Sequence, residues 1–290
     1  MRESIICVGR TGKEPYRFPE TGVQIFSYEE LCYYLSGHML LYLYTLPEEE
    51  LLLYIRDELG LEKLYRQLSK LTDPGRDQMK YFAALFREGN YFSEEEIREI
   101  LDEYRDLKNT PYPVQCKWTG DMLLEAGRAS MAIHYYKEAL KPETMGKMDT
   151  GAAYHNMAVA KSRLFRLEDA KIDFVKAYQY AGDGESLFYY YALIAFTENM
   201  EKAKEEMESF KISELSQESF ENRFAAIAEA YHCSSLAEKQ KKIEYLLQRE
   251  KTEEAENIYE RFVRELQKDF RPEMEMEDDL LTAGLPVRKE

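Results

Sequence analysis

Glycine and proline are scarce in this chain of 290 residues, with 14 and 9 copies respectively. Both residues disfavour helix interiors, so their scarcity agrees with long helices joined by short turns. Windows with strand-like composition are also few after the first 26 residues. Together these absences predict a mainly helical chain.

Cysteine and histidine are equally sparse, with four copies of each. The cysteines lie far apart without a C-x-x-C pair, which favours reduced thiols in a cytoplasmic protein over a disulfide framework. No histidine pairs with another ligand-type residue at metal-binding spacing. The sequence therefore predicts no metal and no other cofactor at these positions, which are Cys7, Cys32, Cys116 and Cys233, with His38, His134, His155 and His232.

Positive charge in excess is absent as well, because the formal net charge is −16 at pH 7. Nucleic-acid phosphates and anionic membrane surfaces both attract clustered Lys and Arg, so we expect no binding to either. The longest apolar stretch, Met39–Leu46, is far shorter than a membrane span, and the first ten residues lack the apolar core of a signal peptide. These absences predict a cytoplasmic protein.

Recognisable catalytic motifs are missing too. The segment Gly9–Lys13 (GRTGK) contains a glycine-rich turn, but a phosphate-binding loop needs four residues between its glycines and Ser or Thr after the lysine. Here two residues separate the glycines, and Glu14 follows the lysine. No G-x-S-x-G elbow occurs, and no cysteine has an activating sequence context. We therefore expect no enzymatic activity.

The most informative pattern lies in residues 151–180, which read GAAYHNMAVAKSRLFRLEDAKIDFVKAYQY. Two amphipathic helices are predicted, with apolar stripes at i, i+3, i+4 and at i, i+4, i+7. Alanine in both stripes lets the two helix backbones approach closely, beside a large aromatic ring. The stripes are Tyr154, Met157 and Ala158, then Ala170, Phe174 and Ala177.

Similar patterns flank this segment on both sides. The equivalent alanines, Ala132, Ala170 and Ala203, are separated by 38 and then 33 residues, and the longer interval contains the turn-rich stretch Lys141–Thr150. The flanking patterns are Gly120, Leu123, Gly127, Ala132, Tyr136 and Ala139 upstream, and Leu187, Tyr191, Ile194, Ala203, Met207 and Phe210 downstream.

This helix-turn-helix unit resembles the tetratricopeptide repeat (TPR), whose period is about 34 residues. The resemblance covers about residues 113–210 and implies an all-α fold in which antiparallel helix pairs stack into a right-handed superhelix. A fourth, degenerate unit is predicted over 236–268, preceded by an extra helix over 218–235. The marks of that unit are Leu246, Ala255, Tyr259 and Phe262. A non-repetitive helical bundle is the alternative.

The first part of the chain shows no repeat. Strand-like segments at Ser4–Gly9 and Gly22–Phe26 predict a short β-hairpin. Capping boxes, Ser27 with Glu30 and Ser93 with Glu96, predict the starts of two helices. The predicted helices span 28–44, 47–58, 61–71, 76–89 and 93–108, before the proline-rich break at 109–113. The predicted parts are an extension (1–26), a helical segment (27–110), the repeats (111–270) and an acidic, flexible tail (271–290).

The resemblance also implies a binding site. In tetratricopeptide arrays, the first helix of each repeat lines a concave groove that binds a peptide or helix of another protein. The residues predicted to face it are Lys117, Trp118 and Asp121 in the first repeat, His155, Asn156, Val159 and Arg163 in the second, and Phe188, Tyr189, Ala192 and Phe196 in the third. An amide at Asn156 can donate to and accept from a peptide backbone, and the aromatic rings can hold apolar side chains.

One subset of the family grips the C-terminal carboxylate of chaperones with Lys, Asn and Arg side chains. At the matching positions only Lys117 and Asn156 fit, while Asp121 and Glu185 would repel a carboxylate. We therefore expect a non-catalytic scaffold that binds another kind of protein segment. The alternatives are a peptide-sensing regulator and a chaperone for a secreted client. Residues 28–60 contain Arg56 as their only Lys or Arg, which does not suit a DNA-binding helix-turn-helix.

Overall fold

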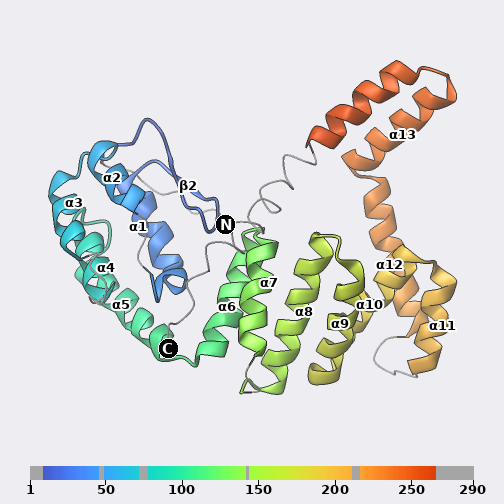
Figure 1. Ribbon diagram of the computed structural model, residues 1–290, viewed down its shortest axis with the longest axis horizontal. Coiled ribbons are helices and arrows are strands. Elements are labelled where there is room, and N and C mark those ends of the chain that lie inside the picture. The colour runs from blue at the N-terminus through green and yellow to red at the C-terminus, as the bar shows by residue number, and fades with distance from the viewer. Residues whose placement is uncertain (1–8, 46–48, 72–77, 142–143, 211–215, 266–290) are drawn as a thin grey trace. The chain divides into compact units, whose positions relative to one another are not determined.

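The computed structural model describes residues 9–45, 49–71, 78–141, 144–210 and 216–265, and Figure 1 shows their helices and strands. The chain divides into two compact units between Arg128 and Ala129, and each unit is described by itself. The fold is all-α with helices paired in sequence order, plus one short β-hairpin, as the sequence predicted.

The hairpin consists of β1 (Tyr16–Arg17) and β2 (Gln24–Ile25), which pair antiparallel. Its turn needs Gly22, whose φ of 74° lies in the region that favours glycine. The predicted second strand, at 22–26, is confirmed. The predicted first strand, at 4–9, lies almost wholly outside the described residues, and β2 pairs instead with Tyr16–Arg17, which the sequence did not predict as a strand.

The helices of the N-terminal unit follow the sequence prediction closely, and both capping boxes are formed. The predicted helix over 28–44 is shorter than expected, because it ends at Gly37 and continues after His38 as the 3-10 helix η1. The elements are α1 (Tyr28–Gly37), η1 (Met39–Tyr42), α2 (Glu49–Asp57), α3 (Glu62–Leu68), η2 (Ser69–Leu71), α4 (Gln78–Arg87), α5 (Glu94–Asn109) and α6 (Tyr112–Glu125).

An aromatic core holds this unit together. Phe18 from the hairpin stacks on Tyr34 of α1, with ring centroids 3.6 Å apart. The Tyr28 hydroxyl donates a hydrogen bond to the carbonyl of Leu85 (2.5 Å) and accepts one from the backbone N–H of Gly89 (3.1 Å). The core therefore joins the hairpin, α1 and α4, a set of contacts that no sequence repeat predicted.

The C-terminal unit is a series of consecutive helices, the first of which lie side by side (Figure 1). Its elements are α7 (Ala129–Leu140), α8 (Lys147–Arg163), α9 (Leu167–Ala181), α10 (Gly184–Thr197), α11 (Met200–Phe210), α12 (Gln217–His232), α13 (Ser235–Gln248) and a further helix over 252–265.

The pair α8 and α9 has the tightest contact, as the alanine pattern predicted. Ala158, Ala170 and Ala177 are fully buried, and Phe174 fills the space beside them. A Cβ added at Gly151 would lie 2.6 Å from the Cβ of Ala181, so only glycine fits there. The predicted helix contact is therefore confirmed.

The next pair, α10 and α11, buries Tyr191, Ala203 and Met207 together with Phe220 of α12. The extra helix predicted over 218–235 is therefore present as α12. After it, α13 and the helix over 252–265 form another hairpin, since Lys239 near the start of one meets Glu265 at the end of the other. Ala237, Leu246 and Ala255 are buried in this hairpin.

This division into two units does not test the domain boundaries that the sequence predicted. Helix α6 follows the proline-rich break at 109–113 but belongs to the N-terminal unit, so the two helices of the predicted first repeat, α6 and α7, fall in different units. The parts at 1–26, 27–110 and 111–270 stay predictions, and the predicted acidic tail at 271–290 lies outside the described residues.

Candidate functional site

Two neighbouring helices of the C-terminal unit carry eight of the residues predicted to bind a partner. His155, Asn156, Val159 and Arg163 lie on α8, and Phe188, Tyr189, Ala192 and Phe196 lie on α10. Both helices are the first of their pairs. We call the set without Phe188 the α8–α10 surface, because these seven side chains are exposed or half-buried.

Three rings form the centre of this surface. Tyr189 stacks on the buried Phe174 of α9, with centroids 5.4 Å apart and planes 13° apart. His155 meets both rings edge-on, at 5.4 and 5.5 Å. Tyr189 is fixed on two sides but still 38% exposed, and Phe196 is 71% exposed. The surface thus offers one oriented ring and one open apolar side chain.

A polar link joins α8 to the start of α10 beneath these rings. Asp183 caps α10 by accepting from the backbone N–H of Ser186 (2.9 Å), and it also accepts from the Ser186 hydroxyl (3.3 Å). Since that hydroxyl donates to Asp183, it accepts from Nδ1 of His155, 2.9 Å away. Burial lowers the pKa of His155, against the opposing effect of Asp183 and Glu185. The hydrogen bond between His155 and Ser186 therefore joins α8 to the start of α10.

This serine and histidine do not form a nucleophile for an external substrate. Ser186 is fully buried, and its hydroxyl is already engaged with Asp183. In the described residues, no group of three or more His, Cys, Asp or Glu side chains is arranged to hold a metal ion. The arrangement fixes the relative positions of α8 and α10, and it leaves the rings of Tyr189 and Phe196 exposed.

Phe188 belongs to the core rather than to the surface. It is 2% exposed and packs against Phe220 of α12. The guanidinium of Arg223 covers its ring at 3.7 Å and forms an ion pair with Glu185. The helical period predicted that Phe188 faces the binding groove together with Tyr189. Because α12 covers it, Phe188 is a packing residue in this structure.

The other three predicted residues lie on α6, in the N-terminal unit. Lys117 forms an ion pair with Asp121 at 2.8 Å, and Trp118 is 39% exposed. Because Asp121 already neutralises Lys117, this lysine is not a free cation for a carboxylate. This supports the rejection of the carboxylate clamp.

Two residues that hold the α8–α10 surface in place were not predicted from the sequence. Phe174 was assigned to helix packing alone, yet its ring also orients Tyr189. Ser186 had no predicted role, although it lies three residues after Asp183, a spacing typical of a helix N-cap. The cap spacing was visible in the sequence, whereas the contact with His155 depends on how α8 and α10 pack.

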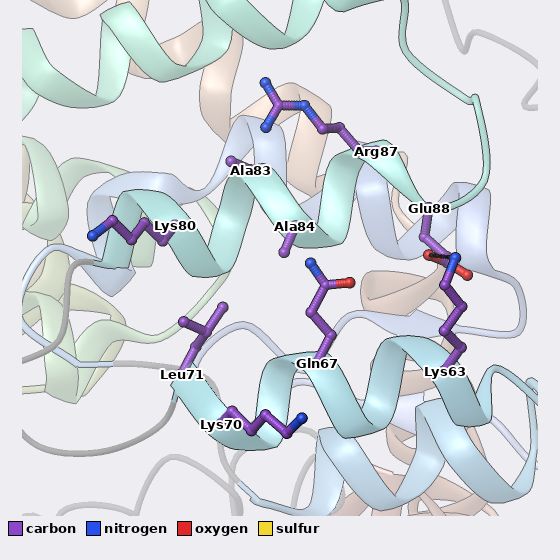
Figure 2. A pocket seen from close by; sticks show the side chains of 9 residues that line it. All are labelled: Lys63, Gln67, Lys70, Leu71, Lys80, Ala83, Ala84, Arg87 and Glu88. Carbon is purple, nitrogen blue, oxygen red and sulfur yellow. Dashed lines mark ion pairs between the residues drawn. The ribbon is translucent and has the colours of Figure 1, made fainter.

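A second candidate is a basic hollow in the N-terminal unit, which encloses about 620 Å³ between α3–η2 and α4. Figure 2 shows Gln67 and Ala84 facing each other across it, with Lys63 beside Glu88. Lys63 lies 3.8 Å from Glu88, and Arg87 pairs with Glu94 at 3.2 Å. Two of the four cations that line the hollow are therefore paired with carboxylates, and none of the residues predicted from the sequence to bind a partner lies in it.

No family model, curated protein or solved structure matches this chain. None of the helices in the described part of the chain is both long and apolar enough to cross a membrane.

Proposed function

We propose that the protein is a non-catalytic scaffold of the tetratricopeptide class, which binds an extended or helical segment of another protein on its α8–α10 surface. One observation carries the proposal: Tyr189 is held in a fixed orientation by Phe174 and His155 and yet remains 38% exposed. Aromatic side chains dominate the binding energy of protein interfaces, and a ring that is already ordered loses little entropy on binding.

The neighbours of Tyr189 fit this role. Phe196 lies two turns, or about 10 Å, further along α10 and is open to solvent, so two apolar side chains of a partner segment can contact the two rings. Ala192 lies between them on α10 and is half-buried, Val159 of α8 is half-buried as well, and Asn156 and Arg163 add polar groups. An interface of apolar anchors with polar groups around them is typical of protein partners.

A triple variant tests the proposal: Asn156→Ala, Tyr189→Ala and Phe196→Ala. Partners are first captured from lysate by crosslinking and identified, and a purified partner is then titrated against both proteins. Loss of an anchor costs on the order of 1–3 kcal/mol, so affinity should fall by about 10- to 100-fold or more.

The matched control replaces the same kinds of side chain on other helices of this unit: Asn222→Ala, Tyr245→Ala and Tyr259→Ala. These positions are exposed, and their replacement should leave affinity unchanged. Both variants need an unchanged helical circular dichroism spectrum. Equal affinities of the triple variant and the wild type would contradict the proposal.

A further inference from the structure

A separate apolar hollow lies in the N-terminal unit, where α1 and η1 pass α5 and α6. It encloses about 460 Å³. Its apolar lining includes Tyr33, Met39, Leu40, Phe92, Ile100 and Met122. Tyr33 is 49% exposed at its edge, while Met39 and Leu40 are buried in its floor. Methionine side chains adapt their shape, so this lining can accept different apolar groups.

One edge of the hollow is acidic. Glu96, Glu99 and Glu103 of α5 line it at i, i+3 and i+7, so they lie along one side of the helix. All three are exposed, and among the described residues Glu99 and Glu103 have no ion-pair partner. Like charges at i, i+4 destabilise a helix, so cations brought to this pair by a partner would relieve that repulsion.

We propose that the hollow binds a basic amphipathic helix of a partner protein. The three carboxylates extend over seven residues, which is about 10 Å along α5. A helix lying beside α5 with Lys or Arg at i, i+3 or i+4, and i+7 matches this spacing. Its apolar side chains then enter the hollow against Tyr33 and Met122.

The chemistry of the lining favours this occupant over a metal ion or a neutral ligand. A hard metal ion needs oxygen ligands on several sides, whereas the side facing these carboxylates is apolar. A neutral apolar ligand would leave Glu99 and Glu103 uncompensated. A partner that is both basic and apolar satisfies both halves of the site, as in other helix-in-groove complexes.

This site goes beyond the proposed function, because it uses the other unit and other residues. The probe is a synthetic amphipathic peptide of about 15 residues built from Leu, Ala and Lys, a length at which an isolated helix becomes marginally stable. A scrambled peptide of identical composition serves as the probe control. Binding is measured by fluorescence anisotropy at low and at physiological salt.

The test variant is Glu99→Gln with Glu103→Gln, and a second variant is Tyr33→Ser. The control is Glu95→Gln with Asp106→Asn, which makes the same change of charge on α5 at residues that do not line the hollow. We expect each test variant to weaken binding on the order of tenfold. The control and the Asn156→Ala, Tyr189→Ala, Phe196→Ala variant should bind the probe as the wild type does.

Two results would overturn the inference. If the control weakens binding as much as the test variant, the probe responds to net charge alone. If the scrambled peptide binds as tightly as the amphipathic one, the hollow does not recognise a helix. Neither result bears on the α8–α10 surface, so the two proposals fail separately.

Discussion

Lys161 and Asp173 form a buried ion pair between α8 and α9, and both side chains are largely removed from solvent. Replacing one partner of such a pair leaves an uncompensated buried charge, which costs about 3–5 kcal/mol of stability. We therefore expect Lys161→Ala to be strongly destabilising in urea unfolding, although Lys176, 4.0 Å from Asp173, offsets part of the cost.

The double variant Lys161→Met, Asp173→Leu distinguishes the effect of the two charges from the effect of side-chain packing. An apolar replacement of similar volume is often neutral or stabilising, so we expect it to recover most of the lost stability. If Lys161→Ala unfolds at the same urea concentration as the wild type, the pair is not buried as described.

His155 makes stability depend on pH. Its folded-state pKa is lowered by burial from the ordinary value of 6.5, so the unfolded chain takes up a proton first as pH falls. The contribution of neutral His155 is thus fully present above about 6.5 and is lost progressively below it. His38 and His134 have lowered pKa values for the same reason and act in the same direction.

The variant His155→Gln removes this titration while keeping a donor near Ser186. We expect its free energy of unfolding to decline less steeply than that of the wild type between pH 7 and 5, measured by urea titration at each pH. His232→Gln, at an exposed position, is the control and should follow the wild type. Identical slopes for all three proteins would contradict the role given to His155.

Among the helix contacts, the one between α8 and α9 gives the most specific prediction. Ala170 has no exposed surface there, so Ala170→Trp should cost at least about 1–3 kcal/mol through overpacking. Neighbouring helix pairs stabilise each other in a stacked array, so the loss of stability should extend beyond the α8–α9 pair. Ile172→Trp is the control, because Ile172 lies on the same helix and is 56% exposed. Equal melting temperatures for both variants would show that Ala170 is not at a helix contact.

Local signals in the sequence predicted most of the helices, whereas contacts between distant segments were not predictable. Alanine and aromatic spacing located α8 to α13, and capping boxes located α1 and α5, because these signals are local. The partner of β2 and the burial of Phe188 were not predictable, since each depends on a segment distant in the sequence. The stacking of Phe174 on Tyr189 was not predictable for the same reason, because the helical period identifies a helix face but not the residues that cover it.

For the whole molecule, the net charge of −16 predicts that DNA and RNA do not bind at physiological salt. If a nucleic acid does bind, the basic hollow of Figure 2 is the site where we expect it. A gel-shift titration at sub-micromolar protein concentration should show no complex. A salt-sensitive shift that Lys63→Gln with Lys80→Gln abolishes would contradict the prediction and assign binding to that hollow.

The proposed function requires that a partner segment lies on the α8–α10 surface. Hydrogen exchange of the wild-type protein, free and bound to its purified partner, tests this most directly. We predict that binding slows exchange in peptides covering 154–163 and 188–197, while peptides covering 217–232 and 235–248 exchange as before. Protection confined to other helices, with α8 and α10 unchanged, would contradict the claim.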